Sequence, residues 1–541
     1  MSLLLASPSH GQSSLTLDDA LNNKGFHAER NYFSPEPFEH YDTLSGNLIL
    51  TFTDLVLPGN AGRDLRFQRT FNNQSFQTGF APDPVTAQSR WTFGFPGVVM
   101  RVFERAVPPN PNFNTIESTV STTPSFVMAD GSWLRTIYTG NPTAPGAVPA
   151  NMEVVSPGFY KYDRLNHSLR APDGTIADYD LNTGRLVQFQ DQFNNLVQLT
   201  WGAGSVVVTQ SLGNGQSRQI TLTLDDQARV THMTYEGREW DYQYEIVFED
   251  KKDITHVTTP EGLAWSFTYD DHSRDAAVMY EWIGLTSVIT PNKGTIRYDY
   301  NEMTVCESSA NPGCELRRLV GARHVEGPRG TTSGTWQIIP SYNGGVYGQH
   351  FNGETRIITP SQTRVDYIHV GTGNPVNQLA GRLVVGYRTI YSPAGQQFEQ
   401  EQSFYVDLPV TLAADVPAIS ERRIIRNGRT FKTEYTYDDQ NFGDYHHPKH
   451  VVETGHMIRV TDYTYQHLAA PWIPGLVLSQ QVQVGTETFK RRWTYDSWGF
   501  RTSEVGWYRP PQASDGIVTN FSRDTMGNVS SKWLAGRTPT I

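Results

Sequence analysis

The chain has 541 residues and a formal net charge of −11, and 12% of its residues are aromatic. Its lysines and arginines are scattered, which argues against a surface that follows the phosphates of a nucleic acid. No segment approaches the ~20 consecutive apolar residues of a membrane-spanning helix, and low-complexity tracts are absent. We therefore expect a folded chain that neither binds nucleic acid nor spans a membrane.

Residues 1–30 are predicted to hold the remnant of a leader and one short helix. The apolar run at 3–6 and the polar stretch after Ala6 resemble the tail of a bacterial signal peptide, without its basic start and long apolar core. Residues 15–24 have the only helical pattern, with Thr16 as N-cap and Gly25 as stop. We expect a secreted or surface protein whose signal peptide was trimmed.

Residues 31–155 are predicted to form an N-terminal β module. Apolar and polar residues alternate at 48–53, 64–69 and 93–102, which is typical of strands with one buried face. The 46 glycines and 32 prolines fall mostly between such runs, where they indicate turns. The predicted fold class is therefore all-β.

From about residue 156 the sequence becomes a degenerate repeat. Each copy is an apolar–polar strand, a turn rich in Gly, Pro or Asn, and a second strand that ends in aromatic residues, often followed by Asp. Adjacent copies recur about every 25 to 31 residues, which marks a repeat architecture. The signature pairs are Tyr269 with Asp270, Tyr298 with Asp299, Tyr437 with Asp438, and Tyr495 with Asp496.

One copy has the pattern of a β-hairpin, which is marginally stable alone in water. Neighbouring hairpins are therefore expected to pair edge to edge into one continuous sheet, with the aromatic side chains stacked along it. Right-handed strand twist bends such a ribbon into a spiral. We predict a spiralling sheet over residues 156–541, incomplete at its C-terminal end.

The two cysteines, Cys306 and Cys314, flank an Asn-Pro-Gly turn. They are predicted to form a loop disulfide if the backbone brings them together, which would indicate an oxidising compartment. Two free thiols are the alternative. Two ligands alone do not hold zinc, so no metal site is predicted here.

Catalytic motifs are weak throughout the chain. The densest set of potential metal ligands is His446, His447, His450 and His456, which is better explained as a linker that enters a hairpin. Pairs such as Asp270 with Asp271, or Asp438 with Asp439, suggest the two acids of a glycosidase, but they recur in several copies as turn-forming residues do. We expect no enzyme, no cofactor and no metal.

Three tryptophans in loops rich in Pro or Gly are the candidate ligand-binding residues. Trp472, Trp498 and Trp507 have the right side-chain type to stack on sugar rings. The alternative is that they fill the interior or cover joints between loops.

The repeat endings, together with openings such as Gly184-Arg185-Leu186, resemble the YD repeats of bacterial RHS proteins. The segment 41–50, the following 54–59 and 65–72, and the short motifs at 130–132 and 169–175 resemble the opening module of that family. The resemblance covers the chain from about residue 35. Related shells occur in the BC components of toxin complexes, and a related barrel occurs in teneurins.

The resemblance implies a hollow β-shell that encloses a C-terminal toxin-like polypeptide. We expect a structural shell segment that encapsulates or presents such a cargo from the same gene, or that works with a partner shell protein. A surface protein for adhesion or carbohydrate binding, with glycans as partners, is the alternative. The chain departs from the family in lacking the Asp-Pro-x-Gly self-cleavage core, since its only Asp-Pro is Asp83-Pro84.

Overall fold

The computed structural model contains three antiparallel-dominated sheets and almost no helix. It describes residues 26, 31–73, 79–80, 89–104, 124–134, 137–138, 153–155, 158–248, 251–270, 283–306, 314–327, 332–343, 352–372, 382–407, 417–438, 445–510 and 516–536. The predicted all-β fold with a continuous repeat sheet is confirmed. The predicted helix at 15–24 lies outside the described residues.

The N-terminal module is a six-stranded sheet in the order β1-β2-β3-β4-β6-β5, where only β5 and β6 are parallel. A single 3-10 turn, η1 at Asn60–Gly62, joins β3 to β4. The strands are β1 (Tyr32–Glu36), β2 (Glu39–Asp42), β3 (Leu48–Leu57), β4 (Leu65–Asn72), β5 (Gly79–Phe80) and β6 (Trp91–Gly94). A small second sheet follows, with β7 (Val99–Glu104), β8 (Pro124–Met128) and β9 (Trp133–Leu134).

The third sheet has 30 strands, which pair in chain order without a crossover. We call its first part, β10–β28, the proximal wall. Its strands are β10 (Ile137–Tyr138), β11 (Glu153–Val155), β12 (Lys161–Asp163), β13 (Ser168–Arg170), β14 (Ile176–Tyr179), β15 (Leu186–Gln190), β16 (Leu196–Gly202), β17 (Ser205–Gly213), β18 (Gln216–Leu224), β19 (Val230–Tyr235), β20 (Arg238–Phe248), β21 (Lys251–Thr258), β22 (Ala264–Tyr269), β23 (Leu285–Ile289), β24 (Thr295–Cys306), β25 (Cys314–Glu326), β26 (Thr332–Asn343), β27 (Asn352–Ile358) and β28 (Arg364–Thr372).

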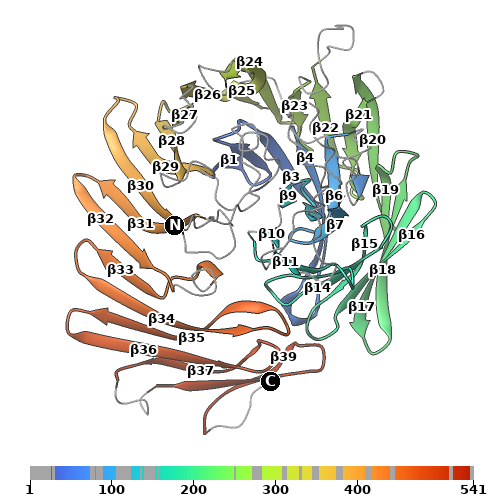
Figure 1. Ribbon diagram of the computed structural model, residues 1–541. Coiled ribbons are helices and arrows are strands. Elements are labelled where there is room, and N and C mark those ends of the chain that lie inside the picture. The colour runs from blue at the N-terminus through green and yellow to red at the C-terminus, as the bar shows by residue number, and fades with distance from the viewer. Residues whose placement is uncertain are drawn as a thin grey trace, which may run out of the picture.

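The remaining strands, β29–β39, form what we call the distal wall. They are β29 (Arg382–Tyr391), β30 (Gln397–Asp407), β31 (Pro417–Arg426), β32 (Arg429–Thr436), β33 (His450–Thr454), β34 (Arg459–Leu468), β35 (Ile473–Val484), β36 (Glu487–Tyr495), β37 (Arg501–Tyr508), β38 (Val518–Arg523) and β39 (Val529–Leu534). The two walls form one ribbon that curves around the N-terminal module (Figure 1).

The repeat sheet begins with β10 and β11, which pair antiparallel with each other and with β12. Both strands precede residue 156 in the chain. Strands of two or three residues give too little alternation to be recognised in a sequence.

The main apolar core lies between the N-terminal module and the inner face of the proximal wall. Module residues such as Phe52 and Trp91 pack against Trp265 and Phe267 of β22, with ring centroids 4.8 to 5.8 Å apart in the contacting pairs. This cluster continues along the wall as far as Ile338 of β26. The module therefore fills the concave side of the proximal wall, and its burial stabilises both parts.

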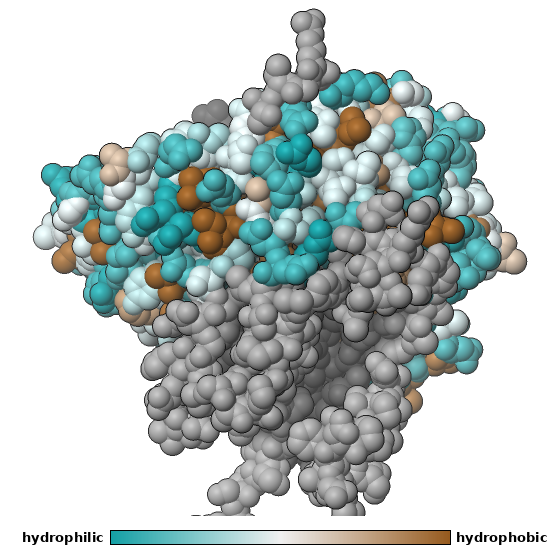
Figure 2. Space-filling view, turned by 90° about the horizontal axis from the view of Figure 1, so that it is seen from above, coloured by the Kyte–Doolittle hydropathy of each residue, from teal (hydrophilic) through white to brown (hydrophobic). Residues whose placement is uncertain are grey.

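The outer surface is mostly hydrophilic or neutral on the face that Figure 2 shows, with apolar residues in scattered patches. Singly scattered apolar side chains are normal on a folded surface. Among the described residues, no helix is long and apolar enough to span a membrane.

Candidate functional site

A hydrogen bond from the terminal aromatic residue of a copy to the first strand of the same hairpin recurs in eight copies and explains the repeat. Tyr269 of β22 donates its hydroxyl to the carbonyl oxygen of Ile254 in β21, at 2.7 Å. Ile254 is the residue at which the β20–β21 pairing shifts register beside Tyr244. A bulge leaves a backbone group outside the ladder, and the tyrosine hydroxyl supplies the missing donor.

The same contact recurs along both walls with acceptors 14 to 20 residues earlier in the chain. Apart from Pro448, each acceptor is the residue at which a register shift occurs. The donor and acceptor pairs are Trp201 with Leu186, Tyr244 with Val230, Tyr269 with Ile254, Tyr300 with Leu285, Tyr405 with Val385, Tyr437 with Ile419, Tyr465 with Pro448, and Tyr495 with Val477. Because bulges bend strands, these bonds fix the curvature of the ribbon once in each copy.

Burial favours the protonated form of several of these phenols. Burial raises the pKa of Tyr244 and Tyr300 well above the usual value, and it raises the pKa of Tyr437 to about 12. A phenolate has no proton to donate to a carbonyl oxygen. The neutral hydroxyl is therefore the form that the bent sheet requires.

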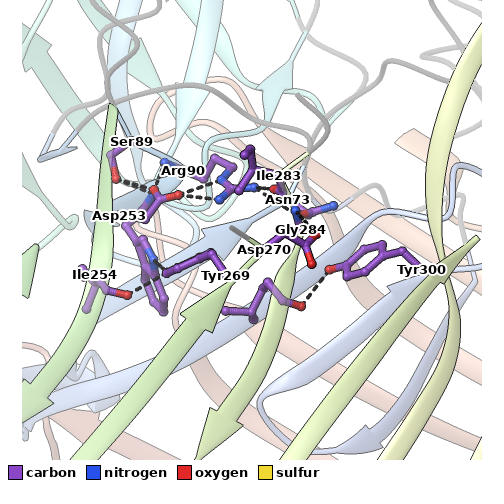
Figure 3. Close-up of polar contacts among 12 residues, drawn as sticks. Asn73, Ser89, Arg90, Asp253, Ile254, Tyr269, Asp270, Ile283, Gly284 and Tyr300 are labelled. Atoms are coloured by element: carbon purple, nitrogen blue, oxygen red, sulfur yellow. Dashed lines mark hydrogen bonds and ion pairs between the residues drawn. The ribbon is translucent and has the colours of Figure 1, made fainter. Parts of the chain in front are cut away.

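The N-terminal module is joined to the proximal wall by buried charged residues, and Figure 3 shows the most enclosed of these contacts. Arg90 donates from Nε and Nη2 to Oδ2 of Asp253 in β21, at 2.8 and 2.6 Å. The Arg90 amide and the Ser89 hydroxyl donate to the other carboxylate oxygen, at 2.8 and 3.0 Å. Both charged side chains are fully buried.

Further contacts of Arg90 and its neighbour connect this ion pair to Tyr269, one of the tyrosines that cap a register shift. Its Nη1 reaches the carbonyl oxygen of Ile283, and its guanidinium lies 5.3 Å from the ring centroid of Tyr269. The indole of Trp91, next in the chain, donates to the Tyr269 hydroxyl at 2.8 Å. One module segment thus contacts β21, the start of β23 and the capping tyrosine of β22.

Two more buried pairs flank this contact. Arg323 of β25 donates through Nε to both oxygens of Glu39 in β2, at 2.8 and 2.9 Å, and stacks 4.4 Å above the ring of Trp336. Burial raises the pKa of Glu39, and Arg323 opposes that rise. In the module, Asp54 contacts Arg69 and also accepts a hydrogen bond from the Tyr242 hydroxyl of β20, at 2.9 Å.

Buried ion pairs add little net stability, but removal of one partner leaves an uncompensated charge. They therefore fix the position of the module on the wall more than they strengthen it. Sequence reasoning missed these residues. Strand alternation in β21 does not mark Asp253, because it is buried next to Ile254 and lies opposite Glu245, off the face that carries Ile254 and Val257.

The last hairpins of the 30-stranded sheet contact its first ones. We call this contact region the closing seam. The ring of Phe500, in the turn before β37, lies 4.3 Å from Phe193 in the turn before β16. Asn195 donates to the Met526 carbonyl at 3.0 Å. Asn528, in the turn before β39, exchanges hydrogen bonds with Asn60 and the Ala61 amide of the module, at 3.2 and 2.8 Å.

Trp472 belongs to the same seam. Its indole donates to the Phe159 carbonyl at 2.8 Å, and Lys161 lies 3.7 Å above its ring. The side chain is only 5% exposed, so its ring is covered in this structure. This placement agrees with the alternative that a tryptophan covers a joint, and it leaves Trp498 and Trp507, at 50% and 46% exposure, as the sugar-stacking candidates.

The other predicted site residues are dispersed. Asp270 accepts from the Gly284 amide and pairs with Arg318, while Asp299 pairs with His324 on the exposed side of the sheet. Asp438 pairs with Lys449, and Asp496 accepts from two amides of its own turn. Tyr298 is buried beside Glu39, so in that copy Tyr300 makes the repeat contact instead.

The histidines point to separate partners. His446 and His447 contact Phe159 and Tyr465 through their rings, whereas His450 pairs with Asp462 and His456 with Arg429. Within the described part of the chain, no group of three or more His, Cys, Asp or Glu residues is placed to hold a metal ion. Asp83, Asp271 and Asp439 lie outside the described residues.

Cys306 and Cys314 end β24 and begin β25, where their backbones lie directly opposite each other. Opposite residues of an antiparallel pair have Cα atoms about 4.5 to 5.5 Å apart, within the range that a disulfide spans. The disulfide remains a prediction that this backbone geometry permits.

No family model matches the chain, and no curated protein matches it. Among solved structures, it is similar to the Photorhabdus luminescens Tc holotoxin pore, with 11% identity, 88% of this chain and 26% of that chain covered, and a TM-score of 0.22. The complex TcdB2-TccC3-Cdc42 gives 10% identity, 94% and 27% coverage, and a TM-score of 0.22. A porin-like protein from Bacteroides uniformis gives 9% identity, 62% and 91% coverage, and a TM-score of 0.19.

The chain spans about a quarter of the length of the toxin structures that it matches. Likenesses at these TM-scores assign no family.

Proposed function

We propose that this chain is the wall of a structural shell that encloses or presents a polypeptide cargo outside the cytoplasm, and that it is not an enzyme. The observation that carries the proposal is the continuous 30-stranded sheet whose last hairpins dock on its first ones. Such a sheet separates an inner face from an outer one. The resemblance of the repeat endings to YD repeats supports the same function and suggests a cargo at the C-terminal side.

The mechanism of such a shell is exclusion. Between its described strands the wall has a continuous backbone ladder, which hinders the entry of a protease between strands. The closing seam is held by side chains and turns rather than by a ladder, so it is the natural place for the wall to open.

Protection from proteolysis tests this proposal. A protease-sensitive polypeptide fused after Ile541 should be digested far more slowly than the same polypeptide alone. Phe500→Ala should restore digestion because it removes a seam contact, whereas Trp498→Ala, an exposed residue of the same turn, should not. Digestion of the fused and free polypeptides at equal rates would rule out the enclosing function.

Adhesion through surface sugars remains the second candidate, because Trp498, in the turn before β37, is half exposed. Loss of glycan-array binding on Trp498→Ala, without loss of folding, would favour it.

A further inference from the structure

The inner face of the distal wall differs from that of the proximal wall and can be traced residue by residue. His369 of β28 contacts Thr43 of the module, so its side of the sheet is the inner one. Residues directly opposite in an antiparallel pair share a face. Tyr367, two residues before His369 in β28, is on the same face. The inner face therefore includes Val385, which lies opposite His369, and Arg388, which lies opposite Tyr367.

The same pairing extends across the remaining strands. The inner partners are Arg388 with Glu401, Glu401 with Ile424, Ile424 with Phe431, Thr433 with Glu453, Glu453 with Arg459, Tyr463 with Gln480, Gln480 with Arg491, Trp493 with Glu504, and Phe521 with Lys532. Charged and aromatic residues alternate here, where the proximal wall has buried apolar ones.

Basic residues outnumber acidic ones on this inner face. Among the described residues of this face, the basic ones are Arg388, Arg422, Arg426, Arg429, Arg459, Arg491, Arg501, Arg509, Arg523 and Lys532, and the acidic ones are Glu399, Glu401, Glu453, Glu487 and Glu504. The whole chain carries a net charge of −11. An acidic protein thus presents a basic surface on the inner side of its distal wall.

The arginines are held in a fixed geometry. Glu504 pairs with Arg491 and Arg501, and Glu401 pairs with Arg422 and lies 3.9 Å from Arg388. Each carboxylate orients guanidinium groups whose remaining N–H donors point away from it.

Aromatic rings lie between these cations. Arg491 lies 4.9 Å from the ring centroid of Trp493 and 6.0 Å from that of Trp507. Arg501 lies 4.9 Å from the ring of Phe521. The face therefore offers oriented cations beside half-covered apolar rings, a combination that suits a ligand with both carboxylates and apolar side chains.

We propose that the inner face of the distal wall binds an acidic polypeptide in extended form. This inference rests on the proposed function, since it names the chemistry of the cargo. The face favours a polypeptide over a nucleic acid because glutamates recur along it, on β30, β33, β36 and β37. A chain of phosphates would meet those carboxylates at each step, whereas a peptide can place an apolar residue there.

The opposite face of the same strands supplies a matched control. Lys432, Lys490 and Arg492 alternate with inner residues and therefore lie on the outer face. The inner triple variant is Arg459→Gln, Arg501→Gln and Arg509→Gln, all partly exposed residues at 47%, 40% and 66%. The outer triple variant is Lys432→Gln, Lys490→Gln and Arg492→Gln. Both variants lose the same formal charge.

Fluorescence anisotropy with a labelled peptide of alternating Glu and Leu tests the inference. The unmodified protein should bind this peptide more tightly than a Lys–Leu peptide or labelled single-stranded DNA, and added salt should weaken binding. The inner triple variant should lose about tenfold or more in affinity, which corresponds to about 1.4 kcal/mol, while the outer triple variant should bind almost as the unmodified protein does. Circular dichroism checks that both variants fold.

Any of three results would overturn the inference. The two variants could lose affinity equally, the protein could prefer DNA or the Lys–Leu peptide, or the acidic peptide could fail to bind. Light scattering that shows copies of this chain associating through the inner face would also overturn it, because the occupant would then be a second copy. Protease protection of a fused cargo without binding of the acidic peptide would refute this inference alone, and failure of protection would refute the shell itself.

Discussion

The proximal and distal walls are built from the same hairpin repeat but have opposite chemistry on their inner faces. In the proximal wall the residues beside the capping tyrosines, such as Phe267 and Ile296, are buried against the N-terminal module. In the distal wall the equivalent positions hold Glu401, Arg491 and Glu504, which remain partly exposed. The comparison shows that the bulge-capping contact defines the sheet, whereas the inner residues are adapted to what each wall faces.

The largest effect is expected at alkaline pH, which should unfold the proximal wall. The folded pKa of Tyr242, Tyr244, Tyr298 and Tyr300 lies above the unfolded value of ~10 because they are buried. A phenol of this kind stabilises the fold fully below pH ~10 and loses that contribution as the pH rises toward its folded pKa. Each unit of raised pKa corresponds to about 1.4 kcal/mol, so several such phenols should together unfold the proximal wall.

The measurement is the free energy of unfolding against pH, together with phenolate absorbance. The buried tyrosines should ionise together with the loss of near-ultraviolet circular dichroism. Ionisation of all tyrosines near pH 10 in a protein that stays folded would contradict the role given to these hydroxyls.

Arg90→Ala should be the most damaging single substitution. It leaves the Asp253 carboxylate fully buried without its cation, and loss of one partner of such a pair costs about 3 to 5 kcal/mol. Arg491→Ala is the matched substitution in the distal wall, where a partly exposed pair contributes about 1 kcal/mol or less. Urea unfolding of both variants gives the two values, and equal values would remove the distinction between the walls.

Removal of one capping hydroxyl should lower the free energy of unfolding by less than Arg90→Ala does. The loss should be larger in the proximal wall than in the distal wall. Tyr269→Phe leaves the Ile254 carbonyl and the Trp91 indole without a partner, which we expect to cost about 1 to 3 kcal/mol. Tyr495→Phe frees only the Val477 carbonyl, at a half-buried site. Water can replace that bond, so the expected cost is about 1 kcal/mol or less.

The smallest effect on global stability is expected at the closing seam. Phe500→Ala removes an aromatic contact worth about 0.5 to 1.5 kcal/mol beyond its buried area. Its main consequence should be local, as faster amide hydrogen exchange in the final strands of the distal wall while exchange in β20–β25 is unchanged. Unchanged exchange in the final strands would show that the seam does not hold them.

Much of the repeat sheet could be predicted from particular residues. The aromatic endings at Tyr269, Tyr437 and Tyr495 predicted one hairpin for each copy. The aspartates that recur after them were interpreted as turn-forming, and Asp496 accepts two amides of its own turn. These features are local, because strand alternation and turn chemistry depend on neighbours in the chain. Trp472 could not be placed in this way, since its partner Phe159 lies 313 residues away.

The sequence by itself determined the hairpins, their order and the aromatic residue that ends each copy, because each depends on a few adjacent side chains. Only the tertiary structure decided which carbonyl each tyrosine caps, that Arg90 meets Asp253 across 163 residues, and where the last turns meet the first. Curvature accumulates over many strands, so contacts between distant copies depend on the sum of all the bulges between them rather than on any single segment.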